Sequence, residues 1–364
     1  MEFVNLKFVR INNGNSCETD GSTLLDYHNL KMLEPIIVDD LLKLNNEEGN
    51  VLLYEQYLKK GFLLAPMRRR SEEKKTKTTN FPARVLLEIT SKCNLKCVMC
   101  PRNVLKRPQI HMSKEVVLKC INEIDDHGVE GLWLYNIGEA LLHPDFKEIF
   151  EHCQNKKNLG SIWLSTNGQS IDVEMMDLLI QSNLTFFNFS INAMKAQTYR
   201  LISPEGDYDI LTSNFCKFLE KKKKFNRFGT TPWLRVQMVE QPQVITEIDL
   251  FLNEYAKKAE ILSINMLEGF SQNVSQNVGY AKIRQHKLEK SCNRIKRDDC
   301  FIFSDGEVAF CDTDFNHEMS IGNIYNSTIE QIWSGSKHRN YELLNKQGRL
   351  EDIEMCRNCL DYDL

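Results

Sequence analysis

The segment ARVLLEITSKCNLKCVMC, residues 83–100, joins a short apolar run to three closely spaced cysteines. The run at 83–90 has the length and composition of a buried strand. Cys93, Cys97 and Cys100 follow it directly, so their thiols are expected together on the loop at the carboxyl end of that strand. Clustered cysteines in a reducing compartment, where disulfides are rare, indicate metal ligation or redox chemistry.

The composition is that of a globular protein, with 42% apolar and 26% charged residues among 364. A net charge of −4 gives no sign of nucleic-acid binding. No apolar run of membrane-spanning length occurs, and residues 1–16 lack the apolar core of a signal peptide. We therefore expect a cytoplasmic protein with no membrane or nucleic-acid partner.

Five more short apolar runs follow the first one, separated by segments with helical patterning. They are GLWLYN (131–136), SIWLSTN (161–167), TFFNFSI (185–191), WLRVQMV (233–239) and ILSINML (261–267). Strands that alternate with helices predict βαβ units and a parallel sheet. Six units predict an α/β fold, a partial (β/α)6 barrel of the TIM type, with its active site at the carboxyl ends of the strands.

Changes in composition divide the chain into four predicted parts. Residues 1–66 are expected to form a small accessory α+β domain, and residues 67–82 a charged linker. An alternative interpretation of the linker is a basic binding patch at residues 68–70. Residues 83–270 contain the barrel, and residues 271–364 form a C-terminal domain with five of the 12 cysteines.

The spacing C-x3-C-x2-C at Cys93, Cys97 and Cys100 provides three ligands with no fourth Cys or His close behind. Structural zinc usually takes four ligands, whereas three leave one iron of a [4Fe–4S] cluster open. In its position after a barrel strand, CNLKCVMC resembles the defining motif of the radical S-adenosylmethionine (SAM) superfamily. The resemblance implies that these cysteines hold a [4Fe–4S] cluster to which SAM binds. Reductive cleavage of SAM then yields a 5′-deoxyadenosyl radical, with electrons from a flavodoxin- or ferredoxin-type partner.

Motifs after the later strands resemble the SAM contacts of that superfamily. YNIGEALLHPD matches the GGE position, with Ile137 in place of the first glycine, and STNG and SINAMKAQTYRLI follow the next two strands. The resemblance implies cofactor contacts at Met99, Gly138, Glu139, Ser165, Asn167, Ser190, Asn192, Gln237 and Met266. Structural roles are the alternative: Met99, Met238 and Met266 as core residues, Ser165 and Asn167 as helix caps, and Glu139 as a first-turn acid.

The tail from Cys292 to Cys359 contains a second cysteine group around a hairpin signal, the Asp305–Gly306 pair. This pattern resembles the SPASM and twitch domains of radical SAM enzymes, and its spacing is similar to that of the 2-deoxy-scyllo-inosamine dehydrogenases of butirosin biosynthesis. The resemblance implies one auxiliary [4Fe–4S] cluster on Cys292, Cys311, Cys356 and Cys359. Cys300 is the alternative to Cys292, and structural zinc is the alternative to iron.

A fully ligated auxiliary cluster suits electron transfer, so the expected reaction is hydrogen-atom abstraction followed by oxidation of a small polar substrate. An aminocyclitol, sugar or nucleoside is the expected class, with the auxiliary cluster as electron acceptor. One alternative is modification of a ribosomal peptide, in which residues 1–66 would bind the leader. Another is a non-enzymatic protein with zinc at both sites. The sequence assigns no catalytic acid or base.

Overall fold

The computed structural model describes residues 80–225, 232–256, 258–259, 261–267, 292, 294–357 and 359, together with five short strands before residue 67. Two sheets organise these residues. The larger has ten strands in the order β1-β11-β10-β9-β8-β7-β6-β12-β13-β14, and the smaller has the order β4-β3-β2-β5. The strands are β1 Phe8–Arg10, β2 Cys17–Thr19, β3 Leu24–Asp26, β4 Met32–Leu33, β5 Ala65–Pro66, β6 Arg84–Leu87, β7 Gly131–Trp133, β8 Ser161–Thr166, β9 Phe186–Ser190, β10 Trp233–Glu240, β11 Ile261–Met266, β12 Asp299–Ile302, β13 Glu307–Ala309 and β14 Gly322–Asn323.

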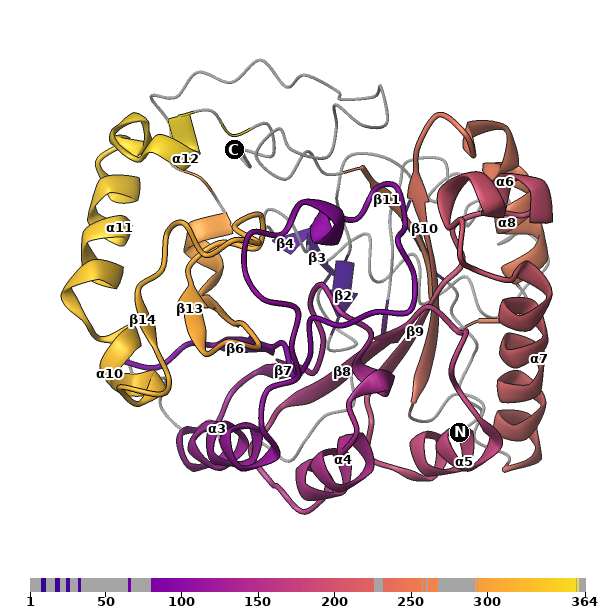
Figure 1. The fold of residues 1–364 in the computed structure, drawn as a ribbon, viewed down its shortest axis with the longest axis horizontal. Coiled ribbons are helices and arrows are strands. Elements are labelled where there is room, and N and C mark those ends of the chain that lie inside the picture. Colours follow the sequence, from indigo (N-terminus) through magenta and orange to yellow (C-terminus); the bar gives the residue numbers. More distant parts are fainter. Residues whose placement is uncertain are drawn as a thin grey trace.

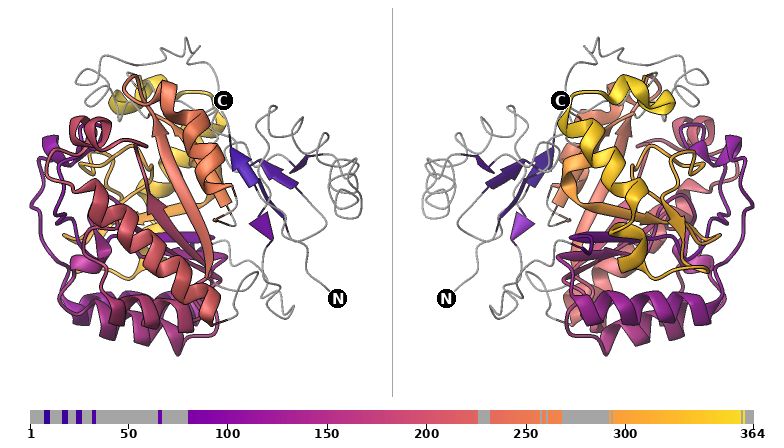
Figure 2. Two further views of the ribbon diagram at one scale, coloured as in Figure 1. Left: turned by 90° about the vertical axis from the view of Figure 1, so that its right-hand side faces the viewer. Right: turned by 90° about the vertical axis from the view of Figure 1, so that its left-hand side faces the viewer.

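All six predicted strands are present as β6 to β11, and each pairs in parallel with its sequence neighbour. Parallel neighbours require a crossover, and helices supply it on the outside of the curved sheet (Figures 1 and 2). The helices are η1 Pro101–Val104, α3 Lys114–His127, η2 Ala140–Leu142, α4 Phe146–Gln154, α5 Val173–Gln181, α6 Ala196–Ile202, α7 Tyr208–Lys224, η3 Ile245–Glu247, α8 Ile248–Tyr255, η4 Arg294–Arg297, α10 Ile329–Trp333, α11 Ser336–Lys346, η5 Leu350–Asp352 and α12 Glu354–Arg357. The prediction of an α/β partial barrel is confirmed.

Alternation along the strands separates the two faces of the sheet. On β9, Phe187 and Phe189 pack against aromatic rings of α7. Their neighbours in register on β10, Leu234 and Val236, are fully buried on the same face. The intervening residues of β8, β9 and β10 therefore project to the inner, concave face.

Aromatic side chains fill the inner face near the start of the strands. Trp133 and Trp163 stack with ring centroids 5.4 Å apart, and Trp163 stacks on Phe186 at 3.8 Å. These rings form a floor beneath the carboxyl ends of β7, β8 and β9. The residues that follow them on the inner face are polar.

The C-terminal part continues the barrel sheet. Strand β12 pairs in parallel with β6, and β13 pairs antiparallel with β12 and β14. The predicted hairpin turns at Gly306, whose φ of +85° favours glycine. Helix α10 begins with a capping box at Thr328 and Gln331. This arrangement confirms a C-terminal unit of strands and helices attached to the barrel.

The boundaries of the four predicted parts stay predictions. In the first part the structure describes strands β1 to β5, and the helices predicted there lie outside the described residues. None of the helices in the described ranges has the length and apolar composition needed to span a membrane.

Candidate active site

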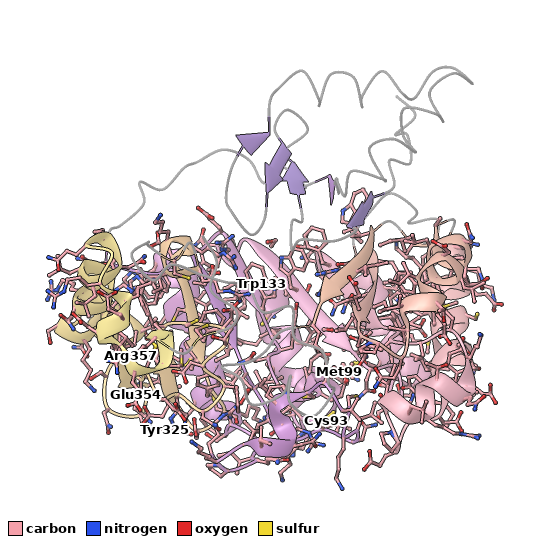
Figure 3. The ribbon with its side chains drawn as sticks, turned by 90° about the horizontal axis from the view of Figure 1, so that it is seen from above. Cys93, Met99, Trp133, Tyr325, Glu354 and Arg357 are labelled. Carbon is pink, nitrogen blue, oxygen red and sulfur yellow. The ribbon has the colours of Figure 1, made fainter. Side chains whose placement is uncertain are left out.

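The cysteine loop leaves β6 and is fixed by contacts on both sides. The backbone N–H of Val98 donates to the carbonyl of Ile202 at 2.8 Å, and that of Cys100 to the carbonyl of Cys97 at 3.0 Å. The Sγ of Cys97 lies 3.0 Å from the hydroxyl of Ser203. These bonds hold the loop at the carboxyl edge of the sheet, where Figure 3 labels Cys93 and Met99.

Burial of the three thiols favours their protonated form in the absence of a metal. Burial raises the pKa of all three, to about 11 for Cys97 and about 12 for Cys100. The guanidinium of Arg102 acts in the opposite direction on each of them. Since ligands must be thiolates, metal loading releases these protons.

Cys93 receives two hydrogen bonds at its sulfur. The N–H of Leu95 donates at 3.5 Å, and Nδ2 of Asn167 donates at 3.6 Å. Asn167 Nδ2 also donates to Oδ1 of Asn94 at 2.7 Å. Donors directed at sulfur stabilise a thiolate and tune the potential of an iron–sulfur cluster.

The loop after β7 lies against the cysteine loop. The N–H of Glu139 donates to the carbonyl of Lys92 at 2.9 Å. A Cβ on Gly138 would meet the carbonyl oxygen of Thr90 at 2.1 Å, so only glycine allows this approach. The glycine of the IGE motif is therefore required for the packing of two loops.

Glu139 is buried with one carboxylate oxygen lacking a partner. Its Oε2 accepts from the N–H of Asn167 at 2.7 Å, whereas Oε1 has no hydrogen bond. Burial raises the pKa of this carboxyl to about 7. An unpartnered buried acceptor beside Cys93 is suited to a ligand that carries an N–H or O–H donor.

The other predicted cofactor contacts have varied surroundings. Asn188 Nδ2 donates to the hydroxyls of Ser165 at 2.8 Å and Ser190 at 3.4 Å. Asn192 Oδ1 accepts from the N–H of Val239 at 3.0 Å, which fixes the chain after β9 against β10.

The predicted methionine and glutamine contacts lie in different places relative to the inner face of the sheet. Gln237 projects to the inner face of β10, whereas Met238 is fully buried on the helix side. Met99 is buried, and its sulfur accepts from Nε2 of Gln241 at 3.9 Å. Met266 ends β11, and its side chain lies outside the described residues.

The tail cysteines separate into a group and an outlier. Cys311 and Cys356 are each influenced by the thiols of Cys292 and Cys359, and burial raises the pKa of Cys311 and Cys356. Cys300 is fully buried in β12, where its titratable neighbours are Cys120, Glu123 and Asp299 rather than the other tail thiols. The structure thus brings Cys292, Cys311, Cys356 and Cys359 together and places Cys300 elsewhere.

Comparisons with known proteins agree with this arrangement. The family model of the Radical SAM superfamily matches residues 87–230, and that of the SPASM iron–sulfur cluster-binding domain matches residues 292–360. The chain therefore contains a radical SAM domain and a SPASM domain. The two matched regions contain both of the cysteine groups described above.

Curated relatives named as GTP 3′,8-cyclases are similar to part of this chain. A GTP 3′,8-cyclase of Desulforamulus reducens is 28% identical over 137 residues, which cover 37% of this chain and 42% of the relative. Across the cyclase relatives the chain spans 37% to 57% of their length.

Solved structures show the same fold at low identity. BtrN, the butirosin dehydrogenase, in complex with AdoMet and 2-DOIA, is 17% identical with a TM-score of 0.51, covering 76% of this chain and 92% of BtrN. SuiB of Streptococcus suis bound to precursor peptide SuiA is 14% identical with a TM-score of 0.52, covering 88% of this chain and 86% of SuiB.

The residues present fit the cofactors of a radical SAM protein with a SPASM domain, namely SAM and two [4Fe–4S] clusters. Cys93, Cys97 and Cys100 supply three thiolates from one loop, and Glu139 Oε1 offers a buried free acceptor beside them. Among the residues that the structure describes, no three His, Cys, Asp or Glu side chains lie close enough together to hold a single metal ion.

Sequence patterns did not indicate Ser203 or Glu88, although both lie at the site. Ser203 directly follows the SINAMKAQTYRLI motif, and its contact with Cys97 depends on a fold between distant segments. Glu88 could have been found from the sequence, because it lies inside the apolar run ARVLLEIT and a buried carboxylate must be paired.

Proposed function

We propose that this radical SAM protein oxidises a small, hydroxyl-bearing polar substrate bound on the inner face of the barrel. The observation that carries the proposal is a row of polar side chains across β8 to β11. An aminocyclitol, sugar or nucleoside belongs to this class of substrate.

The polar row consists of Ser165, Asn188, Arg235, Ser263 and Asn265. Asn188 is in register with Ser165 on one side and with Arg235 on the other. Arg235 Nη2 donates to Ser263 Oγ at 2.8 Å and to Asn265 Oδ1 at 3.4 Å. Because the aromatic floor lies two residues earlier on β8 and β9, the row stands one pleat nearer the carboxyl ends of the strands.

Asn188, in the middle of this row, has a buried amide oxygen without a hydrogen-bond partner. The residue is 3% exposed, and its Oδ1 has no hydrogen bond, while Nδ2 donates to Ser165. Exchanging the amide atoms would leave the nitrogen without a partner instead. A buried amide of this kind is satisfied by a hydroxyl, which both donates and accepts.

The charge of the row favours hydroxyl groups over a cation. The inner-face positions of β8, β9, β10 and β11 include Arg235 and no acidic residue in the described part of these strands. The stacked rings of Trp163 and Phe186 below suit the apolar face of a ring-shaped substrate.

The proposed oxidation balances in atoms and electrons. SAM, when bound, would supply the hydrogen-atom acceptor, so the substrate C–H would become a C–H of 5′-deoxyadenosine. Water would take the hydroxyl proton, and an auxiliary cluster held by Cys292, Cys311, Cys356 and Cys359 would accept the remaining electron. The substrate thereby becomes a carbonyl compound.

The alternative is a maturase that modifies a ribosomal peptide. The fold shared with SuiB, which was solved with a precursor peptide, favours this second candidate. In that case residues 1–66 would bind the leader. The polar row favours the small substrate, because a peptide side chain would bring fewer hydroxyl groups to it.

The test is substrate-dependent cleavage of SAM. Reduced protein is incubated with SAM and separate pools of sugars, aminocyclitols, nucleosides and synthetic peptides. We expect 5′-deoxyadenosine to rise with one small-molecule pool, together with a product lighter by a pair of hydrogens. Asn188→Ala should remove that rise. A rise with peptides alone would overturn the proposal.

A further inference from the structure

Glu88 is a buried carboxylate at the end of β6 that has no role in the sequence motifs. Its side chain is 0% exposed, and that of its partner Arg107 is 1% exposed. Arg107 Nη1 lies 2.6 Å from Oε1 and Nη2 lies 2.8 Å from Oε2. This two-point geometry fixes the orientation of both side chains, unlike a single contact.

Three segments distant in sequence meet at the Glu88 carboxylate. Arg107 lies at the far end of the segment that begins with the cysteine loop. Ser304 of the C-terminal hairpin donates its N–H at 3.1 Å and its hydroxyl at 2.9 Å to Oε1. The N–H of Ile137, which precedes Gly138 and Glu139, donates to Oε2 at 3.3 Å.

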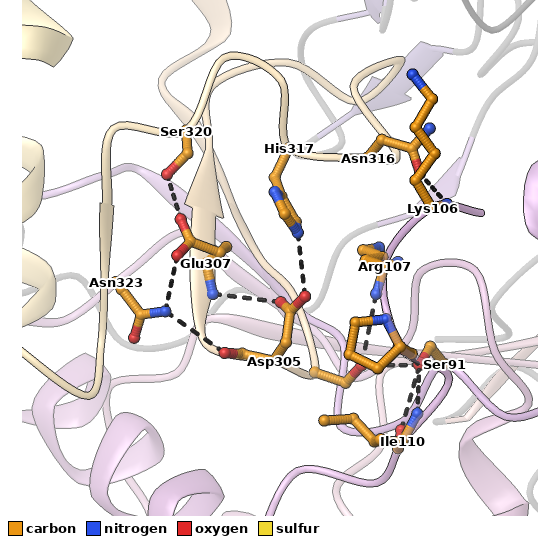
Figure 4. A network of polar contacts seen from close by, with 12 residues as sticks. Ser91, Lys106, Arg107, Ile110, Asp305, Glu307, Asn316, His317, Ser320 and Asn323 are labelled. Carbon is orange, nitrogen blue, oxygen red and sulfur yellow. Dashed lines mark hydrogen bonds and ion pairs between the residues drawn. The ribbon is translucent and has the colours of Figure 1, made fainter.

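Arg107 extends the connection into the C-terminal unit. Its Nε donates to the carbonyl of Phe315 at 2.7 Å, and its guanidinium lies 4.5 Å above the ring of Phe303. Next to it, the N–H of Lys106 donates to Oδ1 of Asn316 at 2.9 Å (Figure 4). The Ser304 hydroxyl also contacts Ser91 Oγ at 2.9 Å, two residues before Cys93.

The arrangement links the predicted SAM loop to the auxiliary-cluster unit through one ion pair. We propose that Glu88 and Arg107 are positioning residues that hold residues 137–139 and the hairpin around Ser304 in fixed relation to the cysteine loop. The inference rests on the proposed roles of Gly138 and Glu139. It implies that SAM binding and order in the hairpin are coupled, each favouring the other.

Substitution of either partner should affect this geometry strongly. Removing one member of a buried pair leaves the other charge uncompensated in the interior. Lysine at position 107 keeps the charge but cannot make the two parallel bonds or the contact with Phe315. Ser304→Ala removes a single hydroxyl and leaves the ion pair in place, so it is the milder change.

The experiment compares Arg107→Lys, Ser304→Ala and a matched control, Lys106→Ala. Lys106 spans the same interface in an exposed ion pair with Glu318 at 2.9 Å, with side chains 75% and 50% exposed. The dissociation constant of SAM is measured from the change that SAM causes in the EPR spectrum of the reduced protein. Amide hydrogen exchange of Ile137 and Ser304 is measured on the same variants, with and without SAM.

We expect Arg107→Lys to retain its iron and to bind SAM about tenfold more weakly, a change of the size usual for coupling between two sites. Its Ile137 and Ser304 amides should exchange faster, and SAM should no longer protect Ser304. Ser304→Ala should show a smaller loss in the same direction, and Lys106→Ala should match the unmodified protein.

Unchanged SAM affinity and unchanged exchange in Arg107→Lys would overturn the inference. Should that variant fail to fold, Ser304→Ala decides the question by the same two readouts. Both measurements are made without substrate. The inference can therefore fail while substrate oxidation stands, and the reverse also holds.

Discussion

Replacing Gly138 with alanine should weaken SAM binding with little effect on cluster loading. The added Cβ would lie 2.1 Å from the carbonyl oxygen of Thr90, 2.8 Å from its carbonyl carbon and 2.9 Å from the carbonyl oxygen of Lys92. All three contacts are backbone atoms, so no side-chain rotation relieves them. The loop that contains Glu139 must move away from the cysteine loop.

The magnitude follows from the cost of inserting a methyl group into a packed site, about 1–3 kcal/mol. If SAM binding must restore the original geometry, this cost corresponds to a roughly 5- to 150-fold rise in the dissociation constant. Equilibrium binding of SAM to the anaerobic, iron-loaded protein measures it. The iron content should stay unchanged, because Gly138 contributes no ligand.

Gly131→Ala, at the first residue of β7, is the matched control. Its Cβ would meet the ring of Trp133 at 2.7 Å and the hydroxyl of Ser161 at 3.0 Å, which are side-chain atoms outside the cysteine loop. We expect lower thermal stability and unchanged SAM affinity. Equal SAM affinity in Gly138→Ala and the unmodified protein would refute the close approach of the two loops.

Two further predictions concern the clusters and pH. Cys292→Ala should lose about four irons per chain, whereas Cys300→Ala should retain its iron, as measured by iron and sulfide analysis; the opposite pattern would exchange the ligand assignments. Burial raises the pKa of Glu139 to about 7, so the carboxylate ionises between pH 6 and 8. If only the ionised form of Glu139 binds SAM, the affinity of the unmodified protein for SAM should rise about tenfold from pH 6 to pH 8. The Glu139→Gln protein should not show this rise. Parallel pH profiles for the two proteins would contradict a role for Glu139.

The barrel could be predicted from the sequence because its signals are local. Each of the six strands is an apolar run of a few residues, and the order β6 to β11 follows from successive crossovers. The position of Cys93, Cys97 and Cys100 at a strand end follows from the same pattern. A cofactor contact at Met238 is wrong, because Met238 is fully buried on the opposite side of β10 from Gln237 and has the alternative role of a core residue.

The long-range contacts could not be predicted. Glu88 and Ser304 are 216 residues apart in sequence, and their contact depends on β12 pairing beside β6. No periodicity in either segment encodes that register. The isolation of Cys300 from the other tail cysteines likewise follows from its place in β12 next to Cys120. Such pairings emerge from the assembled core rather than from any single segment.

The most direct test of the central claim is an iron count coupled to SAM cleavage. The protein is purified anaerobically, reconstituted, reduced with dithionite and assayed for 5′-deoxyadenosine. We expect about eight irons per chain, and about four with no 5′-deoxyadenosine when Cys93, Cys97 and Cys100 are replaced by alanine. Stoichiometric zinc in place of iron, or SAM cleavage that survives loss of the three cysteines, would contradict the account.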